Sequence, residues 1–204
     1  MAKTASTMVP LGTPAPDFAL PDCRAERAGA IVHRDDFASA PALLVMFICN
    51  HCPYVIHVRR ALALLTRQWM KRGVAVVAIC SNDSERYPAD GPEAMAREAA
   101  EQDYPFPYLH DASQAVALAY RAACTPDFFL YDGERRLAYR GELDESRPSN
   151  GIEPSGVELG RAIDFVLEGR VPPEEQRASM GCGIKWRPEN EDDHGPRYTA
   201  TPGL

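Results

Sequence analysis

Two cysteines three positions apart, Cys49 and Cys52, stand between an apolar run and a segment with helical periodicity. Residues 42–48 are all apolar, as in a fully buried strand, and residues 58–69 place apolar side chains on one helical face. We expect the chain to enter the helix at Cys49, where unpaired backbone N–H groups and the helix dipole favour a thiolate. Since the thiolate is the nucleophilic form, Cys49 is the predicted nucleophile and Cys52, one turn further on, the predicted resolving thiol.

The residues between and after the cysteines, Asn50, His51 and Pro53, would support this chemistry. A cationic or hydrogen-bonding His51 stabilises the thiolate and so makes the disulfide more oxidising, unless its ring faces solvent with little influence. Pro53 suits a first helical turn, which needs no intrahelical donor. In the predicted cycle Cys49 attacks an oxidised sulfur, Cys52 displaces the product, and an external reductant restores the dithiol.

The string from Cys49 to Val55, Cys-Asn-His-Cys-Pro-Tyr-Val, resembles the active site of the thioredoxin-like superfamily. It is similar to that of bacterial thioredoxin family or AhpC/TSA-like (redoxin) proteins, and the matching segments extend from about Gly12 to Trp186. Residues 15–20, Ala-Pro-Asp-Phe-Ala-Leu, resemble the N-terminal segment of peroxiredoxins. The resemblance implies an α/β thioredoxin-like fold: a central mixed sheet flanked by helices, with an N-terminal β extension and a C-terminal tail.

A second stretch, Cys124-Thr125-Pro126, opens an apolar strand. In the thioredoxin family the corresponding Thr-Pro peptide bond is cis and faces the two cysteines. The resemblance therefore places Thr125 and Pro126 beside Cys49, with Thr125 offering backbone hydrogen bonds to an extended substrate. It also places Cys124 close enough to Cys49 for an alternative disulfide.

Local patterns predict the elements that position these residues. Val74–Cys80 reads as a second buried strand with Cys80 in the core, and the polar residues 81–84 that follow are either a site at a strand's carboxyl end or a simple turn. An Asp-Gly pair at Asp132 predicts a hairpin. The other expected elements are helices at 94–102, 114–122 and 157–167, and strands at 106–109, 126–130 and 136–141, with a short return strand at 31–32.

The chain changes character after residue 171, so we predict a domain over residues 1–171 and a C-terminal extension over 172–204. Cys182 lies between two glycines in this extension. It either reaches the active site as an additional resolving thiol, or stays idle in a tail that docks through Ile184 and Trp186.

Composition excludes several classes of function. The chain has 204 residues, 45% of them hydrophobic, and a formal net charge of −7, which argues against nucleic acid or an anionic membrane as partner. No apolar run approaches the roughly 18 residues of a membrane helix, and the first ten residues lack the apolar core of a signal peptide. We therefore expect a cytoplasmic protein whose six cysteines are reduced thiols.

The sequence thus predicts a thiol–disulfide oxidoreductase with no bound cofactor or metal. Its expected partners are an oxidised protein or small-molecule disulfide and an external reductant of the thioredoxin or glutathione type. The main alternative is a peroxiredoxin-like thiol peroxidase, an antioxidant. Against it, when Cys52 is aligned with the peroxidatic cysteine, Cys49 and Met46 replace the Thr and Pro typical of peroxiredoxins. Weaker alternatives are a peptide-binding protein and a metal site at Cys49, His51 and Cys52, with Cys124 or Cys182; only one C-x-x-C pair is present.

Overall fold

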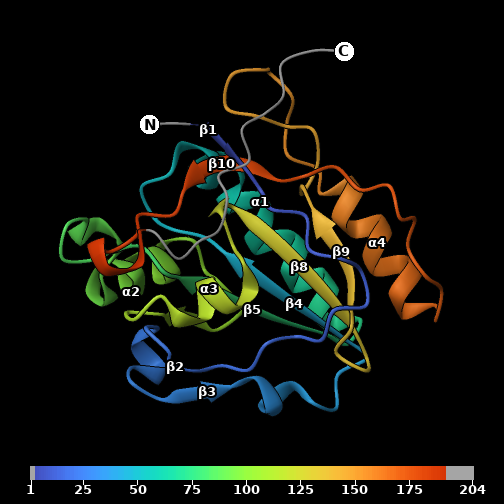
Figure 1. Ribbon diagram of the computed structural model, residues 1–204, viewed down its shortest axis with the longest axis horizontal. Helices are drawn as coiled ribbons and strands as arrows, with labels where there is room; N and C mark the ends of the chain where they lie inside the picture. Colours follow the sequence, from blue (N-terminus) through green and yellow to red (C-terminus); the bar gives the residue numbers. More distant parts are fainter. Residues whose placement is uncertain (1–2, 192–204) are drawn as a thin grey trace.

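A five-stranded mixed sheet forms the centre of the computed structural model, which describes residues 3–191 (Figure 1). Its strand order is β6–β5–β4–β8–β9, with β4 (Ala42–Phe47) parallel to β5 and antiparallel to β8. Every residue of β4 is buried because elements cover both faces of the sheet, which explains the continuous apolar run. The other strands are β5 (Val74–Cys80), β6 (Tyr108–His110), β8 (Asp127–Asp132) and β9 (Leu137–Gly141).

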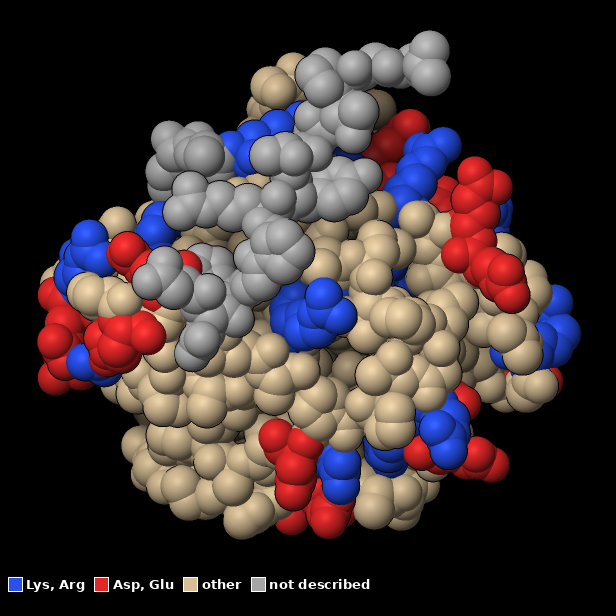
Figure 2. All heavy atoms as spheres, viewed as in Figure 1, with Lys and Arg blue, Asp and Glu red and all other residues tan. Residues whose placement is uncertain are grey.

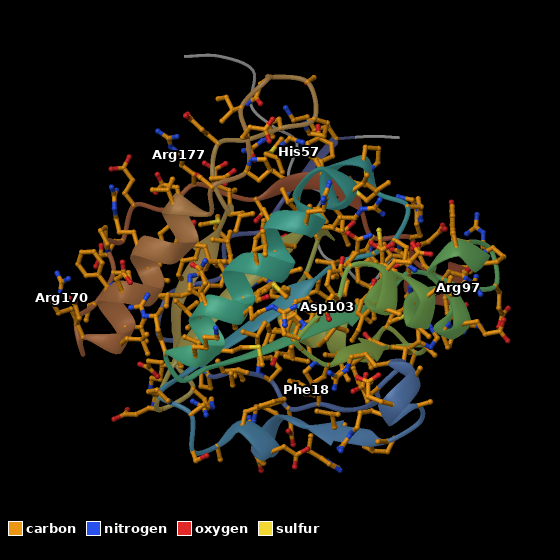
Figure 3. All side chains as sticks on the ribbon, turned by 180° about the vertical axis from the view of Figure 1, so that it is seen from behind. Phe18, His57, Arg97, Asp103, Arg170 and Arg177 are labelled. Carbon is orange, nitrogen blue, oxygen red and sulfur yellow. The ribbon has the colours of Figure 1, made fainter. Side chains whose placement is uncertain are left out.

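Two hydrophobic clusters hold the layers together. On one face α1 (Pro53–Lys71), α2 (Pro92–Glu101) and α4 (Val157–Leu167) pack against alternate residues of β4 and β5, and Figure 3 shows α1 crossing the sheet with His57 near its first turns. On the other face lie α3 (Ala115–Tyr120) and the hairpin of β2 (Ala19–Pro21) and β3 (Ile31–His33). Short 3-10 turns occupy Ala25–Arg27, Arg34–Phe37, Pro88–Asp90 and Pro188–Asn190.

A second, smaller sheet joins segments that are far apart in the sequence. Its order is β1 (Lys3–Ala5), β10 (Met180–Gly183) and β7 (Cys124–Thr125), all antiparallel (Figure 1). Cys182 pairs with Lys3 on one side and with Thr125 on the other. The sequence analysis did not anticipate β1 or β10, because neither segment carries the alternating or β-branched pattern of a strand.

The start of α1 differs from the prediction in a way that matters for the chemistry. The helix begins at Pro53, and Cys52 is the residue that precedes it, so the expectation that the chain enters the helix at Cys49 is wrong. The physical reason lies in the loop: the Asn50 N–H donates to the Asp90 carboxylate instead of lying free at a helix end. The predicted bounds of β5 and α4 are confirmed.

The C-terminal segment packs onto the rest of the protein. Ile184 and Trp186 are buried in the same hydrophobic cluster as α3. The segment therefore docks through these two side chains, as in the second of the two alternatives stated for this segment. The remainder of the predicted tail, 192–204, lies outside the described residues. In the part of the chain that the structure describes, no helix combines the length and apolarity needed to cross a bilayer. Where grey atoms do not cover the face in Figure 2, acidic and basic side chains are interspersed without a continuous basic patch.

A buried ion pair ties the N-terminal strand to the central sheet. Arg140 Nη2 lies 3.2 Å from Asp127 Oδ2, and both side chains are fully inaccessible. Ser6 completes the cluster: its hydroxyl donates to Asp127 Oδ1 and accepts from Arg140 Nε. Arg140 also donates to the Arg121 carbonyl and stacks on the Phe129 ring. Burying two charges is costly unless they are paired and hydrogen-bonded, and these contacts pair the two charges with each other.

We predict that Arg140→Met destabilises the fold by about 3–5 kcal/mol, because it leaves the Asp127 carboxylate buried without its cation. Equilibrium denaturant unfolding measures the loss. The control is Arg67→Met, whose partner Asp103 is exposed, and we expect a change within about 0.5 kcal/mol there. Equal losses in the two variants would show that the buried pair has no special weight.

Candidate active site

Cys49 and Cys52 lie where the chain leaves the carboxyl end of β4 and turns into α1. Strand ends of this kind are where α/β sheets place their ligands and reacting groups. Both cysteines are buried, with exposed fractions of 1% and 0%. Each thiol shifts the pKa of the other, so a change at one sulfur is felt at the other.

The Thr125–Pro126 peptide bond is cis and lies against this pair, as the resemblance implied. Thr125 Oγ1 is 3.2 Å from the Cys49 sulfur. The protonated Cys52 thiol donates to the Thr125 carbonyl at 3.1 Å. Thr125 therefore contacts both sulfurs, one through its side chain and the other through its backbone.

The backbone of Thr125 already has a partner within the chain. β10 pairs with it in antiparallel register, Cys182 opposite Thr125. The expected role of Thr125, to offer backbone hydrogen bonds to an extended substrate, is thus taken by β10 in this structure. The Cys182 thiol lies in the same buried cluster and is close enough to Cys52 for each to shift the pKa of the other, so three sulfurs gather just before the start of α1.

A buried carboxylate organises the loop between the cysteines. Asp90 is fully buried and accepts from the Asn50 N–H at 2.8 Å and from Asn82 Nδ2 at 2.7 Å. His51 Nδ1 lies 2.6 Å from Asp90 Oδ2, and the His51 ring stacks on Tyr87 with an interplanar angle of 7°. The imidazole is consequently held by the protein, and a solvent-facing ring without influence does not describe it.

Further hydrogen bonds fix the same loop from the sheet side. The Tyr108 hydroxyl donates to Asn50 Oδ1 at 2.9 Å, and Asn50 Nδ2 donates to the Ala89 carbonyl. Asn82 in turn accepts from the Lys185 N–H at 2.9 Å. The polar residues after β5 therefore connect the site to the C-terminal segment and do more than make a turn.

The sequence analysis missed Asp90, Tyr108 and Tyr87 as site residues, and it included Asn82 only within the polar run 81–84. Asp90 stands in an Ala-Asp-Gly-Pro string that is typical of a turn before a helix. Its setting near Cys49 depends on contacts between residues about 40 positions apart. The one available signal was the polar run at the carboxyl end of β5.

The two active-site thiols differ sharply in acidity. The hydrogen bond from Cys49 lowers the pKa of Cys52 to about 5 against the opposing effect of burial, with help from Cys182 and the Val55 N–H of the first helical turn. The same bond, together with burial and the negative charge of Asp90, holds the pKa of Cys49 well above its ordinary value. Cys52 is therefore the more acidic thiol of the pair, and the first helical turn contributes to this through the Val55 N–H.

The other four cysteines differ in what surrounds their thiols. Burial, and then the bond to Cys52, raises the pKa of Cys182 to about 12. Cys124 is fully buried, but its thiol faces the carbonyls of Pro126 and Ser179, at 3.6 and 4.0 Å. Cys80 is a core residue, as predicted, and Cys23 is also buried in that cluster.

One group of described residues has the geometry to hold a metal ion: Cys49, His51 and Asp90, with candidate ligand atoms within 4.8 Å of one another. This set differs from the one considered from the sequence, since it includes Asp90 and neither Cys124 nor Cys182. Three ligands fall short of the four of a structural zinc site.

A shallow hollow lies beside Pro126, on the side of α1. Apolar groups of Tyr54, Val58 and Phe128 form its floor, and Glu142, Asp144 and Arg147 bring charge to its wall. A substrate that approaches the cis-proline would meet both kinds of surface.

Two solved structures resemble this chain over nearly all of its length. A conserved protein from Geobacillus kaustophilus is 50% identical, with a TM-score of 0.88 over 92% of this chain and 98% of its own. A hypothetical protein from Sinorhizobium meliloti is 48% identical, with a TM-score of 0.87 over 91% of this chain and 99% of its own. Neither description names an activity.

A more distant structure shares the fold alone. It is described as the thiol:disulfide interchange protein DsbE from Chlorobium tepidum, 19% identical, with a TM-score of 0.60 over 78% of this chain and 99% of its own. Among curated proteins no sequence matches this chain. The sequence profile of the AhpC/TSA family matches residues 11–140, well over half of the 204 residues. The protein has a thioredoxin-like fold and belongs to the AhpC/TSA family.

Proposed function

We propose that the protein is a thiol–disulfide oxidoreductase whose redox pair is Cys49 and Cys52. The observation that carries the proposal is the pair of buried thiols just before α1, both in contact with Thr125 of the cis-proline peptide, with Cys52 the more acidic of the two. An acidic thiol next to a second thiol is the arrangement that disulfide exchange requires. Membership in the AhpC/TSA family supports an oxidoreductase in general terms.

The shared proton sets the order of events. When the pair holds a single proton, that proton is on Cys49 and the charge on Cys52, because Cys52 is the more acidic thiol. Transfer of that proton along the hydrogen bond gives a Cys49 thiolate, which attacks one sulfur of a disulfide and expels the other as a thiolate. Cys52 loses its proton and attacks Cys49 in the mixed disulfide, which releases the second thiol and leaves a Cys49–Cys52 disulfide. A thiol reductant of the thioredoxin or glutathione type then returns two electrons.

The burial of the sulfurs narrows the class of substrate. With exposed fractions of 1% and 0%, the pair is reached only after neighbouring side chains move. β10 also occupies the backbone of Thr125, where an extended peptide would pair. Small oxidised thiols fit these limits better than disulfides held inside folded proteins. The proposal keeps a cytoplasmic location, where such thiols and their reductants coexist.

Thiol peroxidase activity is the second candidate, and one observation favours it. Cys52 directly precedes α1 as an acidic thiol, and Cys49, three residues earlier, is the largest cause of its lowered pKa. A neighbouring hydrogen-bonding side chain and a low pKa are what peroxide attack by a thiolate needs.

We predict that glutathione redox buffers convert the wild-type protein to a Cys49–Cys52 disulfide, which peptide mapping by mass spectrometry identifies. Cys49→Ser and Cys52→Ser should each lower glutathione-coupled disulfide exchange by about a hundredfold or more, because no second thiol remains to complete the cycle. Cys23→Ser, a buried cysteine outside the site, is the matched control and should keep wild-type exchange. A wild-type protein without this disulfide at any poise would refute the proposal.

The acidity of Cys52 gives a pH-dependent prediction. Since its pKa is lowered to about 5, ultraviolet absorbance of the thiolate should rise as pH increases through about 5, and Cys52 should be ionised at neutral pH. Cys49→Ala removes the largest cause and should move the midpoint upward. The stabilised thiolate also implies a disulfide more oxidising than thioredoxin at roughly −270 mV. A single transition near the ordinary cysteine value would contradict the assignment.

Hydrogen peroxide separates the two candidate functions. We expect the wild-type protein to consume peroxide in the presence of glutathione more slowly than it exchanges with oxidised glutathione, because the Thr and Pro of the peroxiredoxin site are replaced. The measurement compares second-order rate constants for the two oxidants under the same conditions. A larger constant for peroxide would make thiol peroxidase the better description.

A further inference from the structure

The strand β10 stands where a substrate strand would stand. It pairs antiparallel with Thr125, the residue before the cis-proline, and its Cys182 lies opposite Thr125. This is the backbone position that an extended substrate of a thioredoxin-like site would use. The chain therefore presents a cysteine of its own to the redox pair.

Two glycines make this approach possible. A Cβ at residue 181 would lie 2.0 Å from the Thr125 carbonyl oxygen, far inside any allowed contact, and a Cβ at residue 183 would lie 3.0 Å from the Thr4 hydroxyl. Only a residue without a side chain fits at position 181. The flanking glycines thus permit the Cys182 backbone to sit against the cis-proline loop.

The side chain of Cys182 faces the same cluster as the redox pair. Cys49, Cys52 and Cys182 all belong to the buried core on the α1 side of the sheet, and Cys182 is only 4% exposed. The Cys182 and Cys52 thiols lie close enough for each to shift the pKa of the other. Cys124 occupies the adjacent strand residue, yet its thiol faces backbone carbonyls instead.

We propose that Cys182 is a third redox thiol, which forms a disulfide with Cys52 by exchange with the Cys49–Cys52 disulfide. This inference rests on the proposed function of the pair. Cys182 loses its proton and attacks the Cys52 sulfur; a Cys52–Cys182 bond forms, the Cys49–Cys52 bond breaks, and Cys49 leaves as a thiolate that takes up the proton. No electrons are gained or lost overall.

The exchange returns Cys49 to the thiol form. The protein still holds one disulfide, so it remains two electrons more oxidised than its fully reduced form. Cys49 could then react with a second oxidised thiol, and the covalent link would hold β10 against Thr125. In the reduced state Cys182 has a different task, because its protonated thiol donates to the Cys52 thiolate and helps to lower the pKa of Cys52. Oxidation of Cys52 removes that charge, so one of the causes that keep Cys182 protonated disappears.

Disulfide mapping of the full-length Cys49→Ser variant tests the proposal. In buffers of oxidised and reduced glutathione, the Cys52 thiolate first takes up glutathione, and Cys182 then displaces it. We expect a Cys52–Cys182 disulfide in Cys49→Ser and in the matched control Cys49→Ser/Cys124→Ala. In Cys49→Ser/Cys182→Ala we expect only the glutathione adduct on Cys52. A persistent adduct with free Cys182 in the first two variants would overturn the inference.

Two further measurements keep the outcome interpretable. The wild-type protein is mapped in the same buffers: a Cys49–Cys52 disulfide there, with no Cys52–Cys182 link in Cys49→Ser, refutes this inference alone and leaves the proposed function standing.

If Cys49→Ser does not fold, Cys182→Ala with wild-type Cys49 serves instead. It should raise the midpoint of the Cys52 thiolate titration by about half to one pH unit, and Cys124→Ala should not. An unchanged midpoint in Cys182→Ala would show that Cys182 does not act on Cys52, and it would overturn the inference.

Discussion

The carbonyl group of Thr125 is the point at which the site is assembled. The Cys52 thiol approaches its oxygen from the start of α1, and the backbone of Gly181 approaches it from β10. The approach of β10 is set by sterics, since any Cβ at residue 181 would collide with the oxygen. The positions of β10, of Cys182 and of the docked segment through Trp186 all follow from this contact. A cis peptide bond before Pro126 turns the same carbonyl toward the cysteines and sets the other half of the arrangement.

A second constraint is the buried charge of Asp90. A carboxylate that is fully removed from water needs several partners: the Asn50 N–H and Asn82 Nδ2 donate to Asp90, and the His51 ring nitrogen lies 2.6 Å from it. These partners come from two parts of the site, Asn50 and His51 from the loop between the cysteines and Asn82 from the turn after β5. One negative charge therefore fixes the loop geometry, and it also works against ionisation of Cys49. The acidity gradient between the two thiols is partly a consequence of how the loop is held.

Much of this fold could be predicted from local sequence. The apolar residues of β4, β5 and α4 recur at the positions that are buried in these elements, so the pattern alone indicates strand or helix. The cysteine pair and the Thr-Pro peptide were recognisable from their spacing and their resemblance to known sites. Asp90 and β10 were not, since their structures depend on distant partners: Asp90 on Asn50, and Met180–Gly183 on Lys3–Ala5 and Thr125. The start of α1 shows how a small shift in a boundary changes chemistry. With the helix start at Pro53, Cys52 and not Cys49 lies next to the first turn, where the Val55 N–H is one of the smaller causes that lower the pKa of Cys52.

The pairing of Lys3 with Cys182 also has a consequence for how the chain folds during its synthesis. A chain leaving the ribosome can pair β4 with β5 and β8 early, since all three are present once residue 132 has emerged. The three-stranded sheet around Thr125 has to wait for residue 183. Until then the N-terminal strand has no neighbour, and Thr125 and the cysteine pair lack their cover. Nascent chains would thus pass through a stage in which the cysteine pair is accessible to disulfides of other molecules in the cell. The strand β10, which is synthesised last, would then cover the pair.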